Sequence, residues 1–196
     1  EKDLWENIKT QATLGRRTGL GVTAVGDTLA ALGLKYGSEE SVTTVEEFYK
    51  TLATSAYRSS CVMAKERGAF KAHNHDKERG HPFLERIWEE APDVYEMSKK
   101  YGRRNIALTT TAPAGSVSVL TQTTSGIEPA FMLHYTRRKK LTENDVDGRV
   151  DFIDDSGDRW QEYSVYHHGF KKWMNTLSVD QVETISNEKL VEMSPY

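Results

Sequence analysis

One segment constrains the fold and the chemistry of this chain more than any other: residues 104–118, RNIALTTTAPAGSVS. Its first half is apolar and β-branched, which is typical of a buried strand. From Ala112 onward it consists of proline, glycine and small residues, which is typical of a tight loop. Small side chains let backbone N–H groups approach an anion closely, and Ser116 and Ser118 add hydroxyl donors. The segment therefore predicts a strand that leads into a tight loop, and on composition alone an ordinary strand-to-helix turn is favoured over an anion-binding loop.

The composition leaves two interpretations of the hydrophobic core open. Of its 196 residues, 37% are hydrophobic and 28% are charged, and this apolar share is low for a compact domain. Either a large surface is solvated or part of the core is supplied from elsewhere. We find no internal repeat and no linker that would split the sequence, so we predict one partial domain over residues 1–196.

Charge and cysteine content argue against several classes of function. The 26 basic and 29 acidic side chains give a net charge of −3, whereas nonspecific nucleic-acid binding needs a basic field. The single cysteine, Cys61, allows no intrachain disulfide and fits a reducing, cytoplasmic location. The first residues do not resemble a signal peptide, and no apolar run approaches the roughly 20 residues that span a bilayer. We therefore expect neither a nucleic-acid nor a membrane partner.

Hydrophobic periodicity and capping signals predict a mixed α and β chain in which helices dominate. Helices are expected over residues 3–14, 23–32, 43–67, 82–101, 163–175 and 178–193. Pro92 is expected to divide the fourth of these into two pieces, and Ser178 is expected to cap the last. Strands are expected over residues 105–111 and 131–136, with a charged loop or hairpin over residues 139–158.

The long helix over residues 43–67 carries the most detailed predictions. Ser41 or Thr43 is expected to cap it, because Glu46 follows Thr43 at the capping-box spacing. Its buried face is expected to contain Val45, Phe48, Leu52, Ala56 and Ser60. Cys61 lies in the same helix and is expected to be a small buried side chain, because a reactive thiolate needs an electropositive, exposed setting.

Charged residues outside the loop are open to a chemical and a structural interpretation. Glu128 could be catalytic if burial raised its pKa, but we favour a role in holding backbone amides or an arginine. The pairs Arg16–Arg17 and Arg103–Arg104 suit phosphates or carboxylates, and we favour structural bracing. The cluster of His73, His75 and Asp76 lacks the ligands of a closed zinc site. No metal site is predicted.

Five segments in this order carry a resemblance to a known family. They are RRTGLGVT at 16–23, LGLKYGS at 32–38, AKERGAF at 64–70, the loop at 113–118 and GIEP at 126–129. From about Leu14 onward the chain resembles the large catalytic subunit of ribonucleotide reductase, most like the adenosylcobalamin-dependent class II enzymes. YTRRKK at 135–140 and YSVYHHGF at 163–170 favour that class.

The resemblance implies an α/β fold, namely a C-terminal-side portion of the ten-stranded reductase barrel. It also implies that one loop holds the substrate diphosphate through backbone amides and hydroxyls. The residues that match this loop are Pro113, Ala114, Gly115, Ser116 and Val117. Ala114 stands where the family motif often has threonine, so one hydroxyl donor is expected to be missing.

The resemblance further implies that this chain does not catalyse the reaction by itself. The family uses a thiyl radical in an Asn-x-Cys-x-Glu loop and two reducing cysteines, all before the matched region, and this sequence contains no such loop. The implied cofactor is adenosylcobalamin, for whose polar tail residues 137–140 are a candidate, although a solvated strand end is favoured. The implied partners are a ribonucleoside diphosphate, the remaining part of the reductase and a thioredoxin-type reductant. The alternatives are a class I large-subunit fragment and a noncatalytic nucleotide- or phosphate-binding domain.

Overall fold

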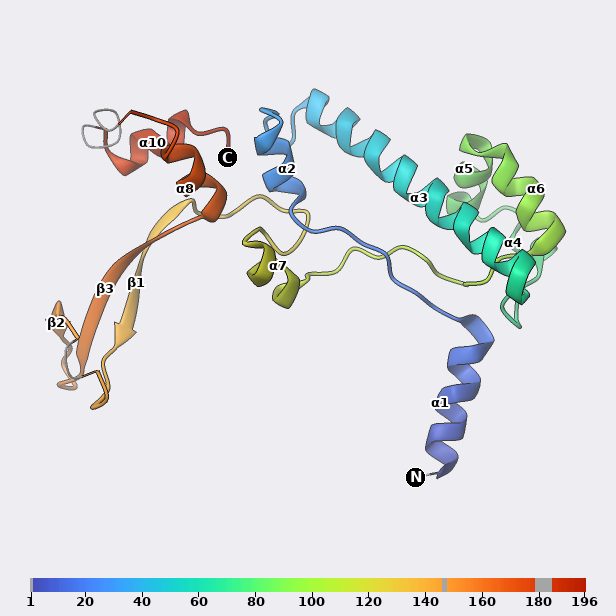
Figure 1. The fold of residues 1–196 in the computed structure, drawn as a ribbon, viewed down its shortest axis with the longest axis horizontal. Helices are drawn as coiled ribbons and strands as arrows, with labels where there is room; N and C mark the ends of the chain where they lie inside the picture. Colours follow the sequence, from blue (N-terminus) through green and yellow to red (C-terminus); the bar gives the residue numbers. More distant parts are fainter. Residues whose placement is uncertain (1, 146–147, 179–184) are drawn as a thin grey trace. The chain divides into compact units, whose positions relative to one another are not determined.

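The computed structural model of the protein describes residues 2–145, 148–178 and 185–196. These residues fall into two compact units, whose elements are labelled in Figure 1. The first unit combines Glu1–Val22 with Gly37–Pro113, and the second combines Thr23–Tyr36 with Ala114–Tyr196. Each unit is therefore built from segments that are far apart in the sequence. The single partial domain over residues 1–196 stays a prediction.

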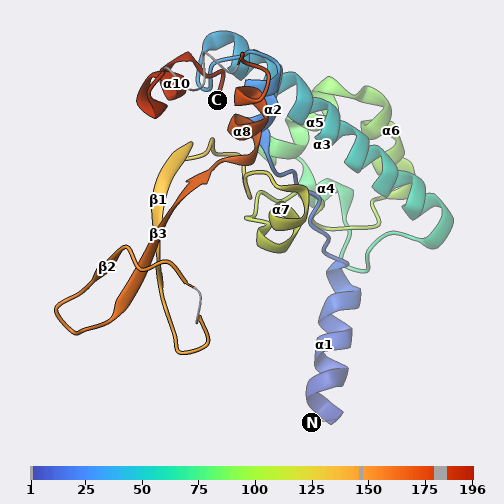
Figure 2. The same ribbon diagram turned by 60° about the vertical axis from the view of Figure 1, so that its left-hand side comes forward.

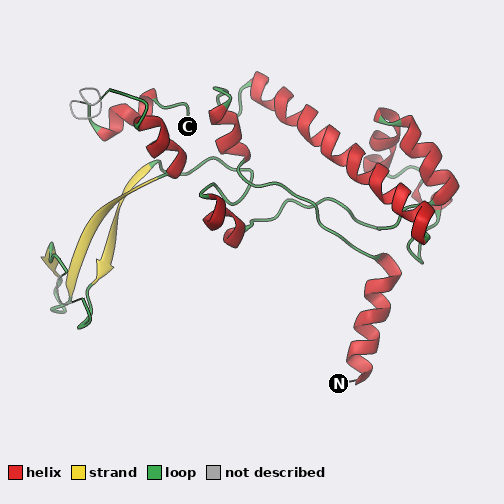
Figure 3. Cartoon of the chain, viewed as in Figure 1, coloured by secondary structure: helices red, strands yellow, loops and turns green. Residues whose placement is uncertain are grey.

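The first unit consists of helices and loops (Figure 3). Its helices are α1 (Lys2–Gly15), α3 (Glu39–Arg67), α4 (His75–Glu78), α5 (Pro82–Glu90) and α6 (Pro92–Tyr101). The first helix is confirmed, although its apolar residues Leu4, Trp5 and Ile8 are exposed. The division of residues 82–101 at Pro92 is also confirmed, because that proline starts α6 at a position where no amide donor is needed.

Helix α3 begins earlier than its capping signals predict. The side chain of Ser38 accepts a hydrogen bond from the Ser41 amide at 3.3 Å, so Ser38 is the N-cap and Ser41 lies inside the helix. Two glutamates in the first turn add favourable charge at the positive end of the helix dipole. The helix ends at Gly68, whose φ of 79° lies in the left-handed region that glycine tolerates.

The core of the first unit lies where the C-terminal half of α3 packs against α5 and α6, an arrangement visible in Figures 1 and 2. Its buried members are Tyr57, Cys61, Leu84, Ile87, Trp88, Ala91, Val94 and Leu108. The predicted buried face of α3 is therefore only partly correct. Ser60 is buried, but Phe48 is 48% exposed, because the core residues of α3 lie further along the helix.

The prediction of a strand over residues 105–111 is wrong, because these residues form no strand of a sheet. The segment is extended and pairs along one edge with residues 18–20. Thr18 N donates to Ala107 O at 3.0 Å, and Leu20 N donates to Leu108 O at 2.7 Å. These bonds give one isolated parallel bridge, between Leu20 and Thr109. In the described part of the chain no further strand continues the ladder.

The second unit combines short helices with a small antiparallel sheet. Its elements are α2 (Val25–Ala31), α7 (Gly115–Thr121), β1 (His134–Lys140), β2 (Phe152–Ile153), β3 (Arg159–Tyr166), α8 (His168–Met174) and α10 (Asn187–Met193). The strand order is β1-β3-β2, and His134 of β1 pairs with Tyr166 of β3. Buried Leu133, Phe170, Met174 and Leu190 form the core of this unit. The helix-rich α/β composition agrees with the prediction.

Two element boundaries in the second unit differ from the prediction. The second strand begins at His134, three residues later than expected. Residues 163–166 belong to β3, because their β-branched and aromatic side chains pair with β1, and α8 starts only after His167. Helix α10, capped by Ser186, lies within the helix expected over residues 178–193. The predicted cap at Ser178 stays a prediction, because residues 179–184 lie outside the described residues.

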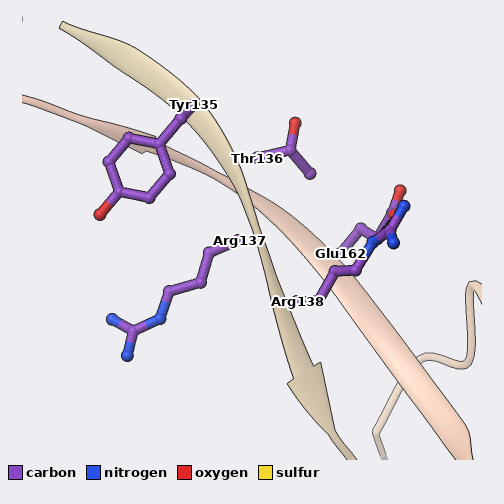
Figure 4. A pocket seen from close by; sticks show the side chains of 5 residues that line it. All are labelled: Tyr135, Thr136, Arg137, Arg138 and Glu162. Carbon is purple, nitrogen blue, oxygen red and sulfur yellow. Dashed lines mark hydrogen bonds and ion pairs between the residues drawn. The ribbon is translucent and has the colours of Figure 1, made fainter. Parts of the chain in front are cut away.

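The charged segment over residues 139–158 was expected to be a loop or a hairpin, and it is a hairpin region. Arg138 contacts Glu162 at 2.8 Å, Lys139 contacts Asp145 at 2.5 Å, and Lys140 contacts Asp158 at 2.5 Å. Figure 4 shows Arg138 beside Glu162, while Arg137 and Tyr135 point to the other side of β1, in an open pocket. The interpretation of residues 137–140 as a solvated strand end is confirmed.

Candidate functional site

The predicted phosphate-binding residues lie where the chain turns into α7. Ala114 is the N-cap of this helix, and its alanine side chain provides no capping hydrogen bond. Gly115, Ser116 and Val117 form the first turn, where helical amides have no partner within the helix. No described residue accepts a hydrogen bond from these three amides. Pro113 is the last residue of the first unit and is exposed.

The position beside Gly115 is open. A Cβ placed on Gly115 would meet no described atom within 4 Å. Ser116 is exposed, and its hydroxyl has no described hydrogen-bond partner. Ser118 differs, since its hydroxyl donates to the carbonyl of Gly115 at 2.8 Å. The expectation that Ser118 supplies a hydroxyl donor to an anion is therefore wrong in this conformation, while the amides and Ser116 stay available.

The N-terminus of α7 is held by a short segment that follows the helix, residues 124–126, which we call the strap. The Ala114 amide donates to the carbonyl of Ser125 at 2.9 Å. The Thr123 amide, just before the strap, donates to the carbonyl of Ser118 at 3.1 Å. The chain thus leaves α7 and returns to its first turn, so the position of Ala114 depends on the position of the strap.

The strap is in turn held by the first turn of α2. The Val25 amide donates to the carbonyl of Gly126 at 3.4 Å, and the Thr124 amide donates to Asp27 Oδ2 at 3.0 Å. Gly26 is buried, and a Cβ there would lie 2.5 Å from the Cα of Pro129. Only glycine permits this approach without a shift of the backbone.

His167 completes this arrangement from the other side of Asp27. Its Nε2 lies 3.2 Å from Asp27 Oδ1, and its Nδ1 accepts a long hydrogen bond from the Phe170 amide at 3.4 Å. The ring of Tyr196 packs against the imidazole at a tilt of 55°, with ring centroids 5.4 Å apart. Burial, with the charge of Asp27 as a further cause, raises the pKa of Tyr196 above its usual range.

Sequence reasoning missed Asp27, Thr124 and His167. Asp27 carried a weak signal, because acidic residues are favoured in the first turn of a helix. His167 directly precedes α8, where a side-chain acceptor is useful. Nothing in the sequence joins these positions, since they lie in three segments that only the fold brings together.

Glu128 is not the buried carboxylate that a catalytic interpretation requires. It is exposed, and its carboxylate folds back over Gly126, where a Cβ would collide with it. Exposure leaves the carboxylate accessible to water, so the burial that would favour a protonated acid is absent.

The arginine pair at residues 103–104 has the expected bracing role. Arg103 is buried, contacts Glu78 at 2.5 Å, and lies over the rings of Tyr57 and Phe70. The guanidinium of Arg104 donates to the carbonyls of Arg67 and Gly68, which end α3. Both arginines therefore hold the first unit together.

Cys61 is fully buried, as predicted, and burial raises the pKa of its thiol to about 11. A thiol in this state stays protonated at neutral pH and is a poor nucleophile. Among the described residues, no group of three or more His, Cys, Asp or Glu side chains is placed to hold a metal ion. No described helix is long and apolar enough to cross a membrane.

Comparison with known proteins places these observations in a family. Residues 2–189 match the family described as "Ribonucleotide reductase, barrel domain". The vitamin B12-dependent ribonucleoside-diphosphate reductase of Mycobacterium tuberculosis is 34% identical over 122 residues, which is 62% of this chain and 15% of that protein. The protein of the same name from Thermoplasma acidophilum is 30% identical over 132 residues, covering 67% of this chain and 15% of that protein.

A further relative has a different name. The ribonucleoside-diphosphate reductase subunit alpha of Chlamydia pneumoniae is 30% identical over 144 residues, covering 62% of this chain and 14% of that protein. The chain thus spans about 15% of the length of the curated relatives it matches. The family match, in contrast, extends over nearly the whole sequence, and it confirms the resemblance that the motifs carry. This chain belongs to the ribonucleotide reductase barrel-domain family.

Proposed function

We propose that this chain is the part of a ribonucleoside-diphosphate reductase that holds the phosphates of the substrate. The observation that carries the proposal is the first turn of α7 in a chain of this family, because its three amides have no described acceptor and the position beside Gly115 is open. Two of the three relatives named above, including the one with 34% identity, are vitamin B12-dependent by name. We therefore assign the complete enzyme to the adenosylcobalamin-dependent class, with the chain as a C-terminal-side portion of its ten-stranded barrel.

Each residue of the loop has a defined part in this proposal. The amides of Gly115, Ser116 and Val117 donate to phosphate oxygens, and the positive end of the helix dipole favours the negative charge. The hydroxyl of Ser116 adds a donor. Pro113 has no N–H and restricts the backbone before the turn. Ala114 contributes no hydroxyl, so the contact rests mainly on backbone donors.

The radical chemistry belongs to other parts of the complete enzyme. In the proposed reaction, a thiyl radical on a cysteine outside this chain abstracts the ribose 3′ hydrogen, and the 2′ hydroxyl leaves as water. Two further cysteines provide the reducing equivalents and are restored by a thioredoxin-type reductant. Cys61 is unsuited to these roles because it is buried and protonated. The contribution of this chain is positioning, which places the ribose against the radical.

The described residues offer no recognisable cradle for adenosylcobalamin. The basic run at residues 137–140 is the candidate that the sequence suggests for its polar tail. Three of its four cations contact acidic side chains of the hairpin region, at Glu162, Asp145 and Asp158. We therefore assign the cofactor site to the remaining part of the reductase, and no step assigned to this chain depends on it.

The direct test is complementation. The chain is mixed with the N-terminal part of a class II reductase, and ribonucleotide reduction is measured with and without adenosylcobalamin. Turnover that requires adenosylcobalamin supports the proposal. Turnover that requires a separate radical-generating subunit in place of adenosylcobalamin would favour the alternative, a fragment of a class I large subunit. Saturable nucleotide diphosphate binding without turnover would favour a noncatalytic binding domain.

The loop assignment has its own test in Gly115→Val. A β-branched side chain at this position would fill the space next to the free amides and keep phosphate oxygens at a distance. We expect the KM of the complemented enzyme for its diphosphate substrate to rise by about tenfold, which corresponds to about 1.4 kcal/mol. No described atom lies within 4 Å of the added Cβ, so the fold should tolerate the change. An unaltered KM would contradict the assignment.

A further inference from the structure

The carboxylate of Asp27 connects two parts of the second unit that are distant in the sequence. Asp27 Oδ2 accepts from the Thr124 amide of the strap at 3.0 Å, and Asp27 Oδ1 lies 3.2 Å from His167 Nε2. The side chain of Asp27 is 13% exposed and that of His167 is 11% exposed. Both oxygens of one carboxylate therefore have protein partners in a site that is largely closed to water.

His167 is a buried neighbour of Asp27. Its Nδ1 accepts a long hydrogen bond from the Phe170 amide, and its Nε2 lies 3.2 Å from Asp27 Oδ1 without a hydrogen bond. The ring of Tyr196 packs against the imidazole at a tilt, and Gly169 leaves no room for a Cβ beside the tyrosine hydroxyl. These contacts pack His167 against the carboxylate that accepts from the strap.

The contact of Asp27 reaches the candidate phosphate loop through the strap. Thr124, which donates to Asp27, directly precedes Ser125, whose carbonyl accepts from the Ala114 amide at 2.9 Å. Ala114 is the residue before the three free amides of α7. A hydrogen bond to a charged acceptor is about twice as strong as a neutral one. Asp27 is thus the strongest side-chain contact on the segment that holds the start of α7.

We propose that Asp27 is a positioning residue for the phosphate loop: it holds the strap, and the strap holds Ala114, so that the amides of Gly115, Ser116 and Val117 point to one phosphate group. This inference rests on the proposed function of the loop. It assigns no contact between Asp27 and the substrate, which a carboxylate would repel. It makes the geometry of the loop depend on a side chain almost ninety residues earlier in the sequence.

The test uses the 196-residue chain with ADP as the probe and amide NMR as the readout. In the wild type, ADP should shift the amide signals of Gly115, Ser116 and Val117. Asp27→Ala should accelerate hydrogen exchange of the Thr124 and Ala114 amides and weaken ADP binding by about tenfold, or about 1.4 kcal/mol. Asp27→Asn keeps a neutral acceptor, so its ADP affinity should lie between those of the wild type and Asp27→Ala, at about threefold below the wild type.

Asp155→Ala is the matched control, because it removes the same group from an exposed position of the same unit. It should leave both readouts unchanged. If Asp27→Ala does not fold, Asp27→Asn carries the test. Wild-type ADP affinity in the variant that folds would overturn the positioning role, as would unchanged exchange at Thr124 and Ala114. No ADP binding by the wild type would instead contradict the proposed function of the loop, and the positioning role would fall with it.

Discussion

Two arginine-rich runs resemble each other in sequence and have opposite surroundings in the structure. At residues 103–104, Arg103 is buried between two aromatic rings and contacts Glu78, whose side chain is 15% exposed. At residues 137–140, the cations lie on an exposed hairpin, and the Arg138 side chain that contacts Glu162 is 64% exposed. The same residue type therefore forms an internal brace in one unit and a solvated surface in the other.

This difference shows that burial, and not the type of residue, decides what an ion pair contributes to stability. A buried charge has lost its hydration, so removal of its partner leaves a large uncompensated cost. An exposed pair keeps most of its hydration and is screened by salt, so it contributes little. The first unit should therefore depend on its ion pair far more strongly than the second unit depends on its several pairs.

The largest expected effect is that of Arg103→Met. The variant keeps much of the side-chain volume but leaves Glu78 without its closest cation. We expect the free energy of unfolding to fall by about 3–5 kcal/mol, the usual cost of breaking a buried pair from one side. Urea-induced unfolding of the 196-residue chain, followed by circular dichroism, measures this change.

The double variant Arg103→Met, Glu78→Gln provides the matched control. It removes the buried carboxylate together with its partner, so part of the lost stability should return. If Arg103→Met alone lowers the free energy of unfolding by less than about 1 kcal/mol, the Arg103–Glu78 pair contributes no more than an ordinary surface pair. The contrast between the two arginine runs would then be wrong.

The next effect concerns pH and His73, which lies near the same pair, with its Nε2 3.7 Å from Glu78. Burial lowers the pKa of His73, and the charges of Arg103 and His75 lower it further, against the opposing effect of Glu78. The unfolded chain binds a proton near its ordinary pKa of about 6.5. As the pH falls below that value, the unfolded state gains a proton that the folded state does not, so stability falls.

Comparison of unfolding at about pH 7.5 and pH 5.5 measures this effect, which one proton limits to about 1.4 kcal/mol per pH unit. His73→Gln should reduce the loss at the lower pH, whereas His81→Gln, at an exposed position outside this cluster, serves as the control. If the two variants respond to pH alike, the burial of His73 does not influence the stability of the first unit.

The fold was predictable where local signals decide it. Pro92 divides two helices because proline suits a first helical turn, and Cys61 is buried because it lies on the packed side of α3. Residues 105–111 show the limit of this reasoning. Their β-branched run indicates extended backbone, but a strand also needs a partner that continues the ladder of hydrogen bonds, and a local pattern does not specify that partner.

The sequence singles out the candidate phosphate loop, whose role stays a prediction, but not the residues that contact it. Residues 113–117 stand out because small residues follow an apolar run, and the family motif names them. Asp27 accepts from the strap, and His167 lies beside Asp27, although the three segments are distant in the sequence. No periodicity or spacing links them, so only the folded structure brings them to notice.

The smallest expected effect is that of Lys140→Ala in the hairpin. Lys140 contacts Asp158 at 2.5 Å, but the two side chains are 53% and 37% exposed. We expect a loss of at most about 1 kcal/mol in the free energy of unfolding. In an exposed pair, the attraction between the charges is only slightly larger than the entropy cost of holding two long side chains in place. Added salt at about 1 M should remove most of that loss, since the screening length falls to about 3 Å.

The salt dependence distinguishes the two arginine-rich runs. The Arg103 pair is shielded from ions, so the loss of stability in Arg103→Met should persist in salt. A loss for Lys140→Ala that approaches that of Arg103→Met, or that persists in salt, would mean that exposure does not separate the two kinds of ion pair in this protein.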